Sequence, residues 1–178
     1  QAIQLKPNFY LSHVRLGQFY VRQGRYAEAA EEFQKEIIII PNSDQAYSRI
    51  GAVYIYLNRY EDAITVLSRS IELRPTAGAY SNLGSAYLRL RRFDDAVAPL
   101  EAAVKLSPRS LNIVGNLGRA YFWSTSQRDR APAVYQRAIE LALDDLAVNP
   151  RNADAHILLA RYYAMLGKKT ESLKHLNE

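Results

Sequence analysis

The chain has three histidines and no cysteine, and histidine is a residue type that can act as general base or as metal ligand. His13 and His156 each lie four residues before a small residue, Gly17 or Ala160, and His175 lies near the C-terminal end. No second ligand follows either of the first two at a spacing typical of a metal site. We interpret these two as packing side chains. The sequence therefore predicts no catalytic residue, no metal site and no cofactor.

Two pairs of adjacent carboxylates could in principle do acid–base chemistry. Asp94 and Asp95 stand where a helix is expected to begin, and acidic side chains are favoured there by the positive end of the helix dipole. Asp144 and Asp145 are interpreted as residues of a solvated helix face. The sequence contains no phosphate-binding glycine loop, nucleophile elbow or calcium-binding loop. We therefore expect a protein that is not an enzyme and that takes no small-molecule substrate.

The composition is that of an ordinary folded domain, with 178 residues, 48% hydrophobic residues and a net charge of +5. A basic chain can bind nucleic acid, anionic membranes or acidic proteins, but here both signs of charge are mixed along the chain. No apolar run is long enough to span a membrane, and no signal peptide begins at Gln1. The lack of cysteine fits a cytoplasmic protein, which is the expected location.

A short motif recurs through the whole sequence and defines its elements. Each copy reads Leu or Ile, then Gly, then two variable residues and Tyr, with a period of about 34 residues. The second half of three copies carries Ala, three variable residues and then Phe or Leu, and a proline closes four copies. The motif glycines are Gly17, Gly51, Gly84 and Gly118, with Ala160 in the fifth copy, and the closing prolines are Pro41, Pro75, Pro108 and Pro150.

The pattern predicts pairs of packed helices. Apolar residues recur at helical spacing within each half of a copy. The glycine is expected where two helices approach closely, because a Cβ atom would hold them apart. The proline ends the second helix. One such pair cannot bury its apolar face alone, so neighbouring pairs must stack.

The sequence resembles the tetratricopeptide repeat in its period, its Leu-Gly-x-x-Tyr and Ala-x-x-x-Phe segments and its closing Pro. The resemblance covers essentially the whole chain. It implies an all-α protein, a right-handed α-solenoid of antiparallel helix hairpins. The segment from Arg69 onward also resembles repeat arrays at the C-termini of bacterial multidomain signalling proteins. Residues 1–178 are then a single array, cut from a longer protein, which we divide into the end of a preceding repeat (1–9), repeat 1 (10–43), repeat 2 (44–76), repeat 3 (77–110), repeat 4 (111–152) and a partial repeat 5 (153–178).

The fourth repeat is longer than its neighbours by about two helical turns. We expect the extra residues in its second helix, so that Asp144, Asp145 and Leu146 extend beyond the neighbouring helices.

The resemblance also implies a binding surface, because in this family the first helices of successive repeats line a concave groove. The family's clamp for a C-terminal carboxylate is not matched, since Ser48 and Ala52 stand where two of its residues would be needed. The hypothesis is an extended acidic peptide segment, held by asparagine amides, arginines and aromatic anchors. The candidate groove residues are Arg15, Arg49, Tyr56, Asn82, Arg89, Asn116, Arg119 and Trp123.

Other interpretations stay open at this stage. These positions could be ordinary solvated side chains with no peptide partner. The chain could be a basic helical-repeat module that binds RNA, although acidic residues interrupt its basic surface, or a regulatory array attached to a catalytic domain outside this sequence. Ile38 and Ile40 stand where the family usually has polar residues, and they could form an exposed patch used in a dimer.

Overall fold

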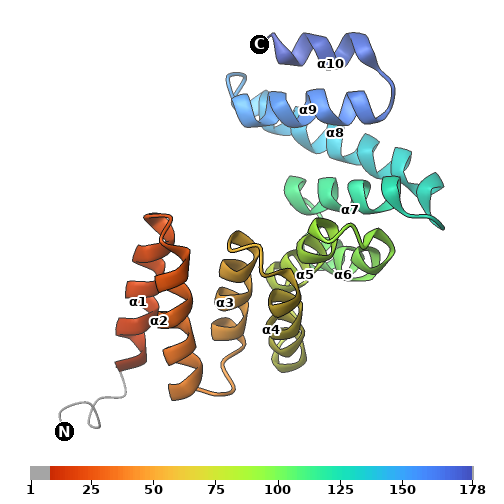
Figure 1. Cartoon of the computed structure of the whole chain (residues 1–178). Helices are drawn as coiled ribbons and strands as arrows, with labels where there is room; N and C mark the ends of the chain where they lie inside the picture. The colour runs from red at the N-terminus through yellow and green to blue at the C-terminus, as the bar shows by residue number, and fades with distance from the viewer. Residues whose placement is uncertain (1–8, 178) are drawn as a thin grey trace, which may run out of the picture. The chain divides into compact units, whose positions relative to one another are not determined.

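The computed structural model describes residues 9–177, so the expected end of a preceding repeat lies almost wholly outside the described residues. Residues 9–177 form ten α-helices and one short 3₁₀ helix, with no strand (Figure 1). The chain divides into two compact units, residues 1–91 and residues 92–178, which we call the N-terminal and C-terminal units. This confirms the all-α prediction.

The helices of the N-terminal unit alternate as first and second members of hairpins, and Figure 1 shows α1 beside α2 and α3 beside α4. They are α1 (Phe9–Arg22), α2 (Tyr26–Ile39), α3 (Asp44–Tyr56), α4 (Tyr60–Leu73) and α5 (Ala77–Arg89). The C-terminal unit contains α6 (Phe93–Leu106), α7 (Leu111–Trp123), the 3₁₀ helix η2 (Arg128–Arg130), α8 (Ala131–Val148), α9 (Ala153–Met165) and α10 (Lys169–Leu176).

Side-chain caps begin three of the first helices. Ser43 accepts a hydrogen bond from the Ala46 amide before α3, Thr76 does the same for Ala79 before α5, and the distances are both 3.2 Å. Asn152 caps α9 in the same way. Each cap satisfies an amide that has no partner inside the helix.

Two glycines of the motif in the N-terminal unit, Gly17 and Gly51, lie where the two helices of a hairpin cross. A Cβ atom on Gly17 would lie 2.5 Å from Cε1 of Phe33, and one on Gly51 would lie 2.5 Å from Cγ of Leu67. These distances are too short for real atoms, so only glycine lets α1 reach α2 and α3 reach α4 at this separation. The structure confirms the close approach that the sequence predicted.

The fourth repeat differs from the others in both its connection and its second helix. α8 has 18 residues, whereas α2, α4 and α6 have 14 each. The segment from Ser124 to Arg130, which includes η2, replaces the short turn that follows α1 or α3. Asp144, near the end of α8, forms an ion pair with Arg109 at 3.0 Å.

The last three of the four consecutive isoleucines at the end of α2 differ in exposure. Ile38 is 70% exposed, Ile39 is also exposed, and Ile40 is half-buried. The exposed patch is therefore centred on Ile38 and Ile39, whereas the sequence analysis placed it on Ile38 and Ile40. Its use in a dimer stays a prediction.

Within the described part of the chain, no helix is long and apolar enough to cross the bilayer, and no group of three potential metal ligands gathers. His13 binds Glu32 across 2.5 Å, and its ring packs edge-on against Phe9. His156 is buried, and its Nε2 lies 3.0 Å from the carbonyl oxygen of Pro150.

Candidate functional site

In each unit, some of the groove residues predicted from the sequence line one pocket. The pocket of the N-terminal unit contains Arg49 and Tyr56, and that of the C-terminal unit contains Asn116, Arg119 and Trp123. The remaining predicted residues line neither pocket, and they are Arg15, Asn82 and Arg89.

The pocket of the N-terminal unit, which we call the α1–α3 pocket, has a volume of about 330 Å³. Its floor is apolar, because Phe33 and Val53 are both buried there. Two arginines, Arg22 from α1 and Arg49 from α3, stand among the lining residues. The full lining is Gln18, Val21, Arg22, Phe33, Arg49, Ala52, Val53 and Tyr56.

Tyr56 supplies an exposed aromatic surface to this pocket. Its side chain is 61% exposed, yet its ring stacks on Tyr26 with 4.6 Å between centroids and 4° between planes. Stacking restrains the ring before any partner arrives, so less conformational freedom is lost on binding.

The two arginines of the pocket differ in what they already bind. Arg49 donates from Nη1 to Glu36 Oε1 over 2.7 Å and from Nη2 to Gln45 over 3.0 Å. Burial raises the pKa of Glu36, and the neighbouring Arg49 charge acts in the opposite direction. Arg22 is exposed and has no ion-pair partner among residues 9–177. Arg22 therefore has its charge available for a partner, whereas Arg49 also holds α3 to α2.

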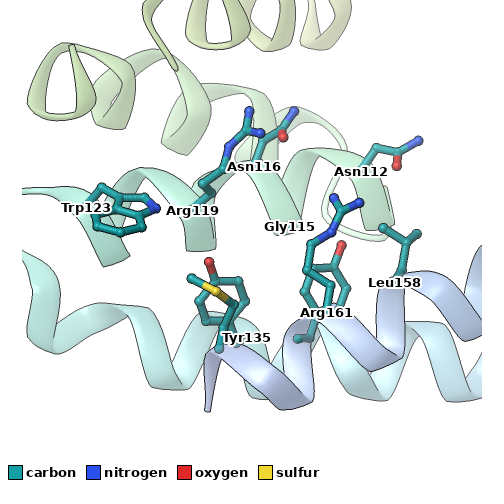
Figure 2. Close-up of a pocket in the computed structure, with 10 residues that line it drawn as sticks. Asn112, Gly115, Asn116, Arg119, Trp123, Tyr135, Leu158 and Arg161 are labelled. Atoms are coloured by element: carbon teal, nitrogen blue, oxygen red, sulfur yellow. The ribbon is translucent and has the colours of Figure 1, made fainter. Parts of the chain in front are cut away.

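The pocket of the C-terminal unit, which we call the α7–α9 pocket, has a volume of about 160 Å³. In Figure 2, Arg119 and Trp123 come from α7 and Arg161 comes from α9, while Tyr135 reaches the pocket from α8. The full lining is Asn112, Gly115, Asn116, Arg119, Trp123, Tyr135, Leu158, Arg161, Tyr162 and Met165.

Two tyrosines form the floor of this second pocket. The rings of Tyr135 and Tyr162 lie 5.7 Å apart, and the side chains are 2% and 3% exposed. Burial raises the pKa of both phenols, while the charges of Arg119 and Arg161 act to lower it. Both hydroxyls are therefore protonated at neutral pH and are hydrogen-bond donors.

Trp123 is the exposed aromatic residue of the second pocket, with 51% of its side chain accessible. Its ring stacks against Phe93 at 6.0 Å and meets Phe122 edge-on at 5.1 Å. Like Tyr56, it is both exposed and held in place by a neighbouring ring.

The floors of the two pockets occupy equivalent places in the repeat. The exposed aromatic residues do not, because Tyr56 lies on α3, the later first helix of its pocket, and Trp123 lies on α7, the earlier one. A Cβ atom on Gly118 would lie 2.7 Å from Cε1 of Tyr135, so Tyr135 packs on its glycine as Phe33 packs on Gly17. Equivalent backbone positions thus carry an apolar floor in one pocket and a phenolic floor in the other.

Sequence reasoning did not include Tyr135 and Tyr162 in the candidate site. The signal that could have found them is a hydroxyl at a position where other copies of the repeat have a purely apolar residue, Phe33 for Tyr135 and Val53 for Tyr162. Arg161 follows Ala160 as Arg119 follows Gly118, so the register of the repeat places it toward the groove, although it was not among the candidate residues.

The sequence profile of the tetratricopeptide repeat matches residues 1–44, 49–110 and 120–178. The chain belongs to the tetratricopeptide repeat family. Its tetratricopeptide repeats, which are typically non-catalytic, form a solenoid of helix hairpins, a fold that supports a protein-interaction scaffold.

Solved structures show the same fold. A structure of MamA from Desulfovibrio magneticus RS-1 is 21% identical, with a TM-score of 0.74 over 94% of this chain and 91% of that chain. TTC0263, a thermophilic tetratricopeptide repeat protein in Thermus thermophilus, is 22% identical, with a TM-score of 0.73 over 94% of this chain and 88% of that one. No curated protein matches the chain in sequence.

Proposed function

We propose that this tetratricopeptide array is a scaffold, part of a larger regulatory protein, that binds an extended acidic segment of a partner protein along its first helices. The observation that carries the proposal is the pair of equivalent pockets, one in each unit. Each is lined by first helices and combines arginine side chains with an exposed, stacked aromatic ring.

The charges of the pockets support an acidic partner. Both pockets are lined by arginine and not by lysine, and none of their described lining residues is acidic. The acidic side chain nearest to a lining arginine, Glu36, is already paired with Arg49. A guanidinium group offers forked donors that match a carboxylate. The net charge of +5 adds a long-range attraction for an acidic segment.

The aromatic residues support a partner that also carries apolar side chains. Exposed Tyr and Trp are enriched at the anchor points of protein interfaces, where one end of the ring is apolar and the other polar. The apolar floor of the α1–α3 pocket, Phe33 and Val53, gives a partner side chain a surface to cover beside Tyr56.

The test is selection from a display library of random linear peptides against the whole chain, followed by affinity measurement on Arg22→Ala and Arg69→Ala. Both variants lose one positive charge, but Arg69 lies on α4 and lines neither pocket. We expect selected peptides to combine acidic and large apolar residues, and Arg22→Ala to weaken binding by about tenfold. Selected sequences without acidic residues, or equal affinities for the two variants, would contradict the proposal.

A further inference from the structure

We infer that the α7–α9 pocket is a binding site for the side-chain carboxylate of an aspartate or glutamate within the partner segment, held by the hydroxyls of Tyr135 and Tyr162 and the guanidinium of Arg161. This inference rests on the proposed function and assigns one chemical group to one of its two pockets.

The hydroxyls of Tyr135 and Tyr162 are donors that the pocket leaves accessible. The two residues are almost fully buried, but neither hydroxyl is among the buried atoms that lack a hydrogen-bond partner. A tyrosine hydroxyl in such a place usually donates to an acceptor. Both line the pocket, so an acceptor placed there would satisfy two donors at once.

Positive charge lies beside those donors. Arg161 is exposed at the pocket and has no ion-pair partner in the described part of the chain. It also borders a separate hollow lined by Asp145 and Asp154, but it is paired with neither. A neutral acceptor would satisfy the phenols, whereas a carboxylate satisfies the phenols and also meets the positive charges of Arg161 and Arg119.

The α1–α3 pocket has no hydroxyl donors at its floor. Where the C-terminal unit has Tyr135 and Tyr162, the N-terminal unit has Phe33 and Val53 at the equivalent positions. The two pockets are built from the same hairpin positions, and the hydroxyls are the chemical difference at the floor. At the floor of the α1–α3 pocket a carboxylate would meet only apolar side chains, so in that pocket we expect an acidic group beside Arg22 and not on the floor.

The geometry of the floor is fixed by glycine. A Cβ atom on Gly115 would collide with the hydroxyl oxygen of Tyr162, so the phenol lies directly against the α7 backbone. The ring of Tyr135 packs on Gly118, where a Cβ atom would lie 2.7 Å from Cε1 of the ring. Both donors are therefore positioned by packing before a ligand arrives, which reduces the entropy lost on binding.

The experiment uses three small probes and the whole chain labelled with ¹³C in its tyrosine rings. N-acetylglutamate N-methylamide carries only a side-chain carboxylate, N-acetylglutamine N-methylamide is its neutral counterpart, and N-acetylalanine carries only a main-chain carboxylate. We expect the first probe to cause saturable shifts of the Tyr135 and Tyr162 ring signals, with no saturable shift of Tyr26. The other two probes should bind at least about tenfold more weakly.

Arg161→Ala should weaken the glutamate probe by about tenfold, whereas Arg151→Ala, which removes an equal charge from an exposed position outside both pockets, should leave it unchanged. Tyr135→Phe removes one hydroxyl and keeps the ring that covers Gly118, so it tests the donor without emptying the core. The inference is overturned if the glutamine probe shifts the same signals equally, if N-acetylalanine binds as tightly or more tightly, or if no probe binds.

The failure of this inference is distinguishable from that of the proposed function. If the probes do not bind but selected peptides remain acidic and depend on Arg22, the carboxylate pocket is wrong and the scaffold proposal stands. If the glutamate probe binds as expected but no acidic peptide is selected, the pocket is real and the proposed partner is wrong.

Discussion

Arg49 Nη1 donates to Glu36 Oε1 over 2.7 Å, which joins α3 to α2 at a point where the glutamate side chain is 2% exposed. The second oxygen, Oε2, is buried and accepts no hydrogen bond within residues 9–177. A buried carboxylate with a single partner depends on that partner to compensate its charge. Arg49 therefore contributes to stability as well as to the α1–α3 pocket, and Arg22 is the better residue for binding tests.

Replacing Arg49 should destabilise the fold. Arg49→Ala leaves the Glu36 charge buried without compensation, and we expect the free energy of unfolding to fall by on the order of 3 kcal/mol. Equilibrium urea unfolding followed by circular dichroism measures the change. The double variant Arg49→Ala with Glu36→Met removes the buried charge as well and should recover most of the loss. If the double variant is no more stable than Arg49→Ala, the charge argument is wrong.

Glu36 and Glu32, one helical turn apart on α2, should give opposite pH dependences of stability. Burial raises the pKa of Glu36 above 4.5, so the stability it contributes is present below that pH and is lost as pH rises through its folded pKa. Burial also acts to raise the pKa of Glu32, but hydrogen bonds from His13 and Lys35 outweigh it and lower the pKa. Stability from Glu32 is present above 4.5 and is lost as pH falls.

The free energy of unfolding of Glu36→Gln, of Glu32→Gln and of the unmodified chain is measured between about pH 4 and pH 7. For each variant, the value of the unmodified chain is subtracted to give a difference at each pH. The Glu36→Gln difference should move in favour of the variant as pH rises, and the Glu32→Gln difference should move against it. Parallel slopes for the two variants would show that burial does not separate these two carboxylates.

The periodic part of the fold could be predicted from the sequence, because a motif such as Leu-Gly-x-x-Tyr reports local helix contacts that recur in every copy. Gly17 against Phe33 is one such contact. The pair formed by Arg49 and Glu36 could not be predicted in the same way, because it depends on how α3 packs on α2 and occurs once. The phenolic floor was missed for a related reason, since the repeat pattern treats Tyr135 as one more large core residue.

Asp94 should hold the long connection between α7 and α8 in place. It accepts hydrogen bonds from the hydroxyls of Ser124, of Thr125 at 2.9 Å and of Ser126 at 3.3 Å, and these bonds, led by that of Ser124, lower its pKa. We expect Asp94→Ala to increase amide hydrogen exchange across residues 124–127. Asp95→Ala is the control, because it removes a neighbouring acidic side chain from the start of the same helix, and it should leave the exchange of residues 124–127 unchanged. An equal increase in hydrogen exchange in both variants would point to the helix dipole as the cause.

Arg91 should be a site where glycine stabilises the chain. Its φ of 59° lies in the left-handed region, where a side chain costs roughly 1 kcal/mol. We therefore expect Arg91→Gly to raise the free energy of unfolding by about 1 kcal/mol in urea denaturation. Asn58 has a similar φ of 58°, but Asn tolerates this region and accepts a hydrogen bond from Tyr60 over 2.5 Å. Asn58→Gly should gain less than Arg91→Gly, and the reverse order would refute the backbone argument.

The same substitution should have opposite effects at two helical glycines. In Gly118→Ala the new methyl group would meet the Tyr135 ring at 2.7 Å, and the ring is enclosed by the core, so we expect a loss of about 1–3 kcal/mol in the free energy of unfolding. Gly78, in α5, has nothing within 4 Å of the position of a Cβ atom, so Gly78→Ala should gain about 0.5–1 kcal/mol through the lower entropy of the unfolded chain. Thermal and urea unfolding measure both changes.

Gly118→Ala should also affect the α7–α9 pocket, because Tyr135 forms part of the pocket floor. We expect the variant to shift the ring signal of Tyr135 and to weaken binding of the glutamate probe, whereas Gly78→Ala should have neither effect. A Gly118→Ala variant with unchanged stability and an unshifted Tyr135 signal would mean that the ring moves freely, and the floor would then lack the fixed donors on which carboxylate binding depends.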